Sequence, residues 1–229
     1  TCWNFWRLLE FLDIPYFYYG MSGSILPGGT CGTFVDLGKP TGIWHYRNAW
    51  HETYTKRLVS ALKKHLADTH KPQLLASMYG AAQSDIGIYD LPVFEPMAGY
   101  GNCWTPYRVF PSYAQQHVIY TIQQDFTQQN RFFDTVIPHF LDPDLYKPSE
   151  KCGNYLLYLG RNVPEKGIAL AEEAANALGI ELVKIYSGCY GEEKIRLLGE
   201  ALAVMAPTCY VEPFGYVAIE AQMCGTPVI

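Results

Sequence analysis

The most constraining feature of this sequence is its C-terminal segment, residues 212–229, which reads as a turn, a helix and a strand in succession. Glu212-Pro-Phe-Gly215 is typical of a tight turn, and the apolar residues 217–223 predict a short helix. Gly225-Thr-Pro227 ends that helix before a strand begins at Val228. Strands that alternate with helices in this way indicate an α/β fold with a parallel sheet.

Two carboxylates flank the start of this helix. Glu212 lies just before its N-terminus, and Glu220 lies about one and a half turns inside it. The unpaired N–H groups of a helix N-terminus favour a bound phosphate, and carboxylates nearby can accept hydrogen bonds from sugar hydroxyls. The segment therefore predicts a nucleotide-sugar site, although two glutamates at this spacing alone would more simply be solvated surface residues.

The same residues resemble the E-x7-E signature of retaining glycosyltransferases of family 4. The match includes Pro-Phe-Gly after Glu212 and Cys-Gly-Thr-Pro-Val-Ile after Glu220. The resemblance implies the GT-B fold of two Rossmann-like, doubly wound parallel-sheet domains. It also implies that Glu220 binds the ribose hydroxyls of the donor. Glu212 and the backbone N–H groups of Phe214 and Gly215 would hold the donor sugar.

A second match lies upstream, where residues 155–159 predict a strand and residues 168–178 a helix. The loop between them, with Gly160-Arg161 and Lys166-Gly167, resembles the family's element that binds the nucleotide diphosphate. A fixed Arg161 and Lys166 would stabilise the negative charge that develops on the leaving diphosphate. The alternative is that Arg161 and Lys166 are ordinary charged residues of a loop and bind no ligand.

The chain divides into two expected domains. The polar, breaker-rich linker around residues 148–153 places an acceptor-side domain at 1–148 and a nucleotide-sugar-binding domain at 149–229. The chain opens inside a helix and closes in a strand, so we expect both domains to be incomplete. Residues 186–191 leave too little chain for the further strand that family members have there. We expect a segment to be missing at this point, and the alternative is a shortened domain.

In the first domain we expect helices at 5–12, 52–69 and 107–116 and strands at 14–19, 74–79 and 92–95. Ligands of such folds gather at the carboxyl ends of strands. Tyr79 and Gly80 follow one of these strands, and Gly99 and Tyr100 follow another, so we expect them to line a cleft unless they form ordinary turns. His51 and His117 are expected to be structural.

The composition excludes several classes of binding partner. A net charge of −5 does not suit duplex nucleic acid as the main partner, and the basic residues of helix 52–69 are most simply a solvated face. The seven cysteines lack metal-binding spacing, and no apolar run reaches the roughly 18 residues of a membrane helix. We expect a cytoplasmic protein, and peripheral contact with a membrane is left open.

These features together predict a retaining glycosyltransferase. It would move a sugar from a nucleotide diphosphate-sugar donor to a carbohydrate or other hydroxyl acceptor. Most aromatic residues lie before residue 150, which suits a carbohydrate acceptor in the first domain, although a core rich in aromatic residues would explain most of them. We expect no cofactor and no metal, because Arg161 and Lys166 would neutralise the diphosphate. The alternatives are an inactive nucleotide-sugar-binding module and a related GT-B epimerase or phosphorylase.

Overall fold

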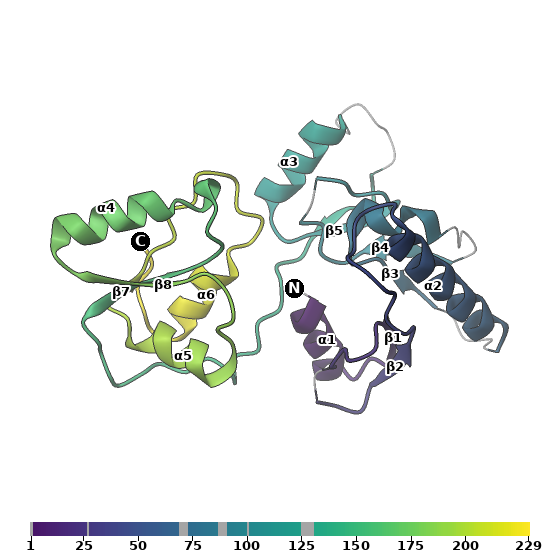
Figure 1. The fold of residues 1–229 in the computed structure, drawn as a ribbon, viewed down its shortest axis with the longest axis horizontal. Helices are drawn as coiled ribbons and strands as arrows, with labels where there is room; N and C mark the ends of the chain where they lie inside the picture. Colours follow the sequence, from purple (N-terminus) through teal and green to yellow (C-terminus); the bar gives the residue numbers. More distant parts are fainter. Residues whose placement is uncertain (1, 27, 69–72, 87–90, 100, 125–130) are drawn as a thin grey trace. The chain divides into compact units, whose positions relative to one another are not determined.

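The computed structural model describes residues 2–26, 28–68, 73–86, 91–99, 101–124 and 131–229, and these form two compact units (Figure 1). Unit 1 is Thr1–Phe140 and unit 2 is Leu141–Ile229. The boundary expected after residue 148 falls inside unit 2. The reason is that Tyr146 packs against the core of unit 2. No described helix is both long enough and apolar enough to cross a lipid bilayer.

Unit 2 is built on a three-stranded parallel sheet in the order β8-β7-β9. Its strands are β7 (Tyr155–Leu159), β8 (Glu181–Ile185) and β9 (Ala203–Val204). A 3-10 turn, η3 (Pro164–Lys166), leads into the first helix of the unit. The helices are α4 (Ile168–Leu178), α5 (Gly191–Glu200) and α6 (Tyr216–Met223).

Helices cover both faces of this sheet. Successive side chains of a strand point to opposite faces, so Leu156 and Tyr158 pack with Ala171 of α4, whereas Leu157 packs with Leu198 of α5. Figure 1 shows α4 on one side of the strands and α5 and α6 on the other. A parallel sheet buried on both faces is the doubly wound arrangement that the alternating sequence pattern predicts.

The sequence-based elements of unit 2 are largely confirmed. Strand 155–159 and helix 168–178 have the expected bounds, and the helix expected at 217–223 begins one residue earlier. Val228 pairs with Val204 as a parallel bridge beside β9. Residues 186–190 lead from β8 directly into α5, with no further strand in this described segment.

Unit 1 contains two parallel sheets. One pairs β1 with β2, and the other has the order β3-β4-β5-β6. Its strands are β1 (Tyr16–Gly20), β2 (Gly32–Asp36), β3 (Leu75–Ala76), β4 (Val93–Glu95), β5 (Tyr107–Phe110) and β6 (Thr135–Val136). Its helices are α1 (Cys2–Phe11), α2 (Ala49–Ala67), the 3-10 helix η1 (Gly80–Ile86) and α3 (Tyr113–Gln123).

The prediction of a helix at 107–116 is wrong. Residues 107–110 form β5, in which Arg108 and Phe110 are buried, and α3 begins only at Tyr113. Ser112 caps that helix, because its hydroxyl accepts a hydrogen bond from the Gln115 N–H at 3.1 Å. The apolar positions of residues 107–116 also fit the period of a helix, although the segment consists of a strand and a helix cap. The hydrophobic pattern alone therefore predicted a helix here.

The core of unit 1 encloses an ion pair. The Arg108 guanidinium donates to Asp134 Oδ2 from Nε at 3.0 Å and from Nη2 at 2.5 Å, and both side chains are 0% exposed. Arg108 Nη1 also donates to Gln123 at 2.6 Å, and the Tyr120 hydroxyl donates to Asp134 Oδ2 at 3.0 Å. The pair ties β5 to α3 and to the segment before β6, so it is a structural part of this unit.

Candidate functional site

The candidate site lies in unit 2, where two loops leave the carboxyl edge of the sheet. One loop follows β7 and spans residues 160–167, and the other follows β9 and spans residues 205–215. All three strands are parallel, so their carboxyl ends share one edge, which is where α/β sheets bind ligands. The Cys209 N–H donates to the Glu165 carbonyl at 2.8 Å and joins the two loops.

Gly167 allows the loops to approach each other. It has φ of +70°, and a Cβ at this position would collide with the carbonyl oxygen of Pro207. Any other residue would be strained in this left-handed conformation and would also push the loops apart. The glycine expected at this position from the sequence therefore fixes the local geometry of the site.

Lys166 and Glu212 meet between these loops. The ammonium of Lys166 lies 2.5 Å from Glu212 Oε2, and the Tyr210 hydroxyl donates to the same oxygen at 2.8 Å. The Lys166 Nζ also lies 5.0 Å from the centre of the Tyr210 ring. The Lys166 and Glu212 side chains are 19% and 29% exposed, so the pair is sheltered but within reach of a ligand.

The surroundings keep Lys166 charged. Burial by itself disfavours the ammonium, but the hydrogen bonds with Glu212 and Tyr210 outweigh it and raise the pKa of Lys166 above its ordinary value. A protonated amine beside a carboxylate can hold an anion while the carboxylate accepts a hydrogen bond from a hydroxyl.

Two further candidate residues, Phe214 and Gly215, lie in the turn before α6. Gly215 adopts the left-handed conformation, with φ of +81°, immediately before the first residue of α6. Its carbonyl accepts from the N–H groups of Ala218 and Ile219, which closes the first helical turn. The Phe214 ring packs edge-on against the Tyr216 ring, with 5.0 Å between centroids. Phe214 and Gly215 thus lie on one turn that follows Glu212.

Glu220 is enclosed. It is 3% exposed, accepts a hydrogen bond from the Tyr146 hydroxyl at 2.8 Å, and lies 2.6 Å from the Lys194 ammonium of α5. Burial and the Glu220 charge raise the pKa of Tyr146. No local sequence pattern marks Lys194 or Tyr146 as a partner, because both lie far from Glu220 along the chain.

Gly160 and Arg161 lie on the loop after β7, as expected. The Gly160 N–H donates to the Ile185 carbonyl at 3.0 Å, and the Arg161 carbonyl accepts from the Tyr158 hydroxyl at 3.0 Å. The Arg161 side chain is exposed, and no residue of the described chain forms a recorded bond with its guanidinium. Its backbone is therefore fixed while its charged group faces solvent.

The remaining candidates lie in unit 1. Tyr79 is 65% exposed after β3, and its N–H donates to the Gln83 side chain at 3.4 Å. Gly80 is buried at the start of η1, and a Cβ there would lie 3.1 Å from the Asn102 carbonyl oxygen. Gly99 is half-buried after β4, and Tyr100 lies outside the described residues.

His51, expected to be structural, joins α2 to η1. It is 5% exposed, its Nε2 lies 2.6 Å from the Ala82 carbonyl oxygen, and its Nδ1 accepts from the Arg47 N–H at 3.2 Å. Both ring nitrogens thus have partners within unit 1.

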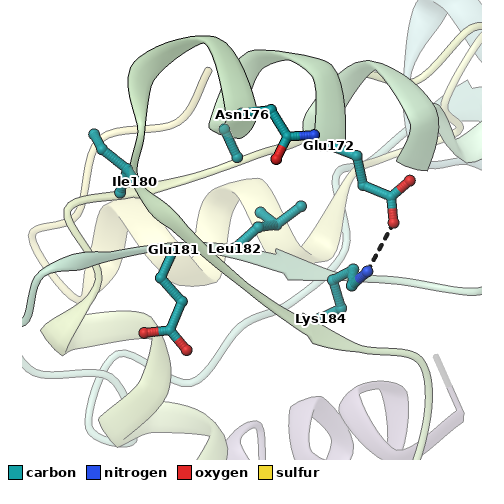
Figure 2. Close-up of a pocket in the computed structure, with 7 residues that line it drawn as sticks. Glu172, Asn176, Ile180, Glu181, Leu182 and Lys184 are labelled. Atoms are coloured by element: carbon teal, nitrogen blue, oxygen red, sulfur yellow. Dashed lines mark hydrogen bonds and ion pairs between the residues drawn. The ribbon is translucent and has the colours of Figure 1, made fainter.

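Figure 2 shows a separate pocket of about 330 Å³ between α4 and β8. The Lys184 ammonium lies 2.7 Å from the Glu172 carboxylate, and both residues line the pocket together with Asn176 and Leu182. None of the candidate site residues lines this pocket.

The structure resembles the solved structures of two other proteins. It superposes on AviGT4, a glycosyltransferase involved in avilamycin A biosynthesis, with a TM-score of 0.62 and 21% identity, over 98% of this chain and 67% of that one. It also superposes on Anabaena Alr3699/HepE in complex with UDP and glucose, with a TM-score of 0.55 and 14% identity, over 85% of this chain and 66% of that one. HepE in complex with UDP-glucose gives a TM-score of 0.53 at 14% identity, over 93% of this chain and 79% of that one.

These likenesses confirm the expected fold class, which is α/β of the GT-B type with Rossmann-like parallel sheets. The chain spans about two thirds of the length of AviGT4. No protein-family model matches the sequence, and no curated protein matches it at a significant level.

Proposed function

We propose that this chain belongs to a retaining glycosyltransferase that uses a nucleotide diphosphate-sugar donor and a hydroxyl acceptor. The observation that carries the proposal is the meeting of Lys166 and Glu212 at the carboxyl edge of the unit 2 sheet, beside the Gly215 turn of α6. A fold shared with the glycosyltransferase AviGT4 and with HepE, which was solved in complex with UDP-glucose, supports it. A cytoplasmic location is part of the same proposal.

The site offers complementary groups for each part of such a donor. Lys166 and the exposed Arg161 are cations for the diphosphate, and the adjoining Glu212 with the Phe214–Gly215 backbone is an acceptor and donor set for the sugar. As the glycosidic bond breaks, charge grows on the diphosphate oxygens, and these cations bind the transition state more tightly than the ground state.

The proposal is tested with a panel of nucleoside diphosphate-glucose donors, including UDP-glucose. Thermal shift identifies the donor, because a ligand at a hundred times its dissociation constant adds about 2.7 kcal/mol of stability. NMR then follows donor consumption with carbohydrate acceptors and the anomeric configuration of the product. Transfer with retention supports the proposal, and inversion contradicts it. Binding without turnover would instead indicate an inactive nucleotide-sugar-binding module, and acceptor-independent breakdown an epimerase or phosphorylase.

Glu220→Gln is expected to weaken donor binding about tenfold, because a hydrogen bond to a charged group contributes about 1.5–3 kcal/mol. The substitution keeps the side chain's size and an acceptor for Tyr146, so the packing around α6 survives. A ribose can reach the carboxylate only where Lys194 yields its contact with Oε2. Isothermal titration with the donor measures the change.

Glu200→Gln is the matched control for this prediction, since Glu200 is a charged residue of α5 that pairs with Arg196 at 3.0 Å and is no candidate for donor binding. The Glu200→Gln protein should bind the donor with the same affinity as the unmodified protein. If Glu220→Gln also leaves the affinity unchanged, Glu220 is only the structural partner of Lys194 and Tyr146.

Turnover is expected to persist after treatment with a metal chelator. Lys166, whose pKa is raised, and Arg161 carry the positive charge that a divalent ion would otherwise supply to the diphosphate. The initial rate is measured with EDTA, without it, and after magnesium or manganese is added back. Loss of the rate with EDTA and recovery with either ion would contradict the expectation.

A further inference from the structure

The carboxylate of Glu212 is bound on one side only. Both Lys166 Nζ and the Tyr210 hydroxyl are bonded to Oε2, at 2.5 and 2.8 Å, whereas Oε1 has no recorded hydrogen bond with the described part of the chain. A carboxylate oxygen has two lone pairs, so Oε2 is saturated and Oε1 keeps its full capacity to accept. The two donors therefore fix the plane of the group and leave one oxygen for a ligand.

Tyr210 contacts both charged groups of the pair. Its hydroxyl donates to Glu212, and its ring lies 5.0 Å from the Lys166 ammonium, within the range of a cation–π interaction. Its own backbone is held by the neighbouring Cys209 N–H, which donates to the Glu165 carbonyl. At 36% exposure, the tyrosine is anchored at its base and adjoins the open part of the site.

We propose that Tyr210 is a positioning residue that orients Glu212 Oε1 toward a hydroxyl of the donor sugar. The inference rests on the proposed function and specifies which part of the donor the residue serves. A hydrogen bond to a sugar hydroxyl needs its acceptor within a few tenths of an ångström of one place. A glutamate held only by Lys166 could rotate about its last side-chain bond and lose that place.

The part of the donor affected by Tyr210 is therefore predictable. Glu212 acts on the sugar, whereas Lys166 acts on the diphosphate, so loss of the tyrosine hydroxyl should weaken binding of the nucleotide sugar and spare binding of the nucleotide diphosphate. Loss of Lys166 should weaken both. Tyr210→Phe isolates the hydroxyl, because the phenylalanine ring keeps the cation–π contact and the packing.

The experiment compares Tyr210→Phe with the unmodified chain by titration with UDP-glucose and with UDP, or with the pair that the donor panel selects. We expect about a tenfold loss of affinity for the nucleotide sugar, the lower end for a hydrogen bond to a charged group, and less than a twofold change for the diphosphate. Equal losses for both ligands, or no loss for either, would overturn the inference. An unmodified chain that binds no nucleotide sugar would overturn the proposed function itself.

A double-substitution cycle separates positioning from a general structural effect. If Tyr210 acts through Glu212, adding Tyr210→Phe to Glu212→Ala should change nucleotide-sugar binding by less than twofold. A tenfold further loss in that background would show that the hydroxyl touches the ligand or supports the fold by another route. Melting temperatures of all four chains verify that each is folded.

Discussion

Replacing Lys166 with alanine should lower kcat by about 10²- to 10³-fold, the effect of removing one preorganised group that stabilises developing charge. The ammonium lies beside Glu212 on the loop after β7, and its pKa is raised above the ordinary lysine value, so it is charged at neutral pH. Donor affinity should fall less than kcat, because the charge on the leaving diphosphate is greater in the transition state than in the bound donor.

Lys184→Ala is the matched control. Lys184 is also a lysine paired with a glutamate, at 2.7 Å, but it lies on β8 over the pocket beside α4, which none of the candidate site residues lines. Its loss should leave kcat and donor affinity within about twofold, since exposed ion pairs contribute little. Steady-state rates with the selected donor give kcat, and direct titration gives the donor affinity. A Lys166→Ala chain with normal kcat would show that Lys166 only anchors Glu212.

Much of unit 2 could be predicted because its signals are local. Residues 155–159 and 168–178 have apolar patterns of the right length, and Gly160, Gly167 and Gly179 mark the ends of the elements. The loop position of Lys166 followed from those elements, and that of Glu212 followed from the turn before the helix expected at 217–223. Their meeting did not, because it depends on a backbone contact between Gly167 and Pro207 that no local pattern encodes.

The sequence could not reveal the partners that decide what each carboxylate can do. Tyr210 lies two residues before Glu212, a spacing that gives no sign of a shared oxygen, and Lys194 reaches Glu220 only after α5 and α6 pack on the same face of the sheet. In unit 1, β2 was missed because its five residues lack a strict alternation of exposed and buried positions. These contacts and this strand depend on tertiary packing, which a local sequence pattern does not contain.

Replacing Asp134 with alanine should destabilise unit 1 by about 3–5 kcal/mol, the effect of leaving one member of a buried ion pair without its partner. Asp134 Oδ2 accepts from two nitrogens of Arg108 and from the Tyr120 hydroxyl, and the Arg108 side chain is 0% exposed. After the change the guanidinium would remain buried and would lose the carboxylate oxygen that two of its nitrogens now contact. All five tryptophans lie in unit 1, so urea unfolding followed by their fluorescence reports on this unit.

The double variant Arg108→Met/Asp134→Leu separates an unpaired charge from lost packing. Apolar replacement of both partners of a buried pair is often neutral or stabilising, so the double variant should recover at least half of the stability lost in Asp134→Ala. Recovery is incomplete, because the Tyr120 hydroxyl and the Gln123 side chain lose their charged partners. A double variant as unstable as the single one would mean that the loss comes from packing around β5 and α3, and the ion-pair explanation would then fail.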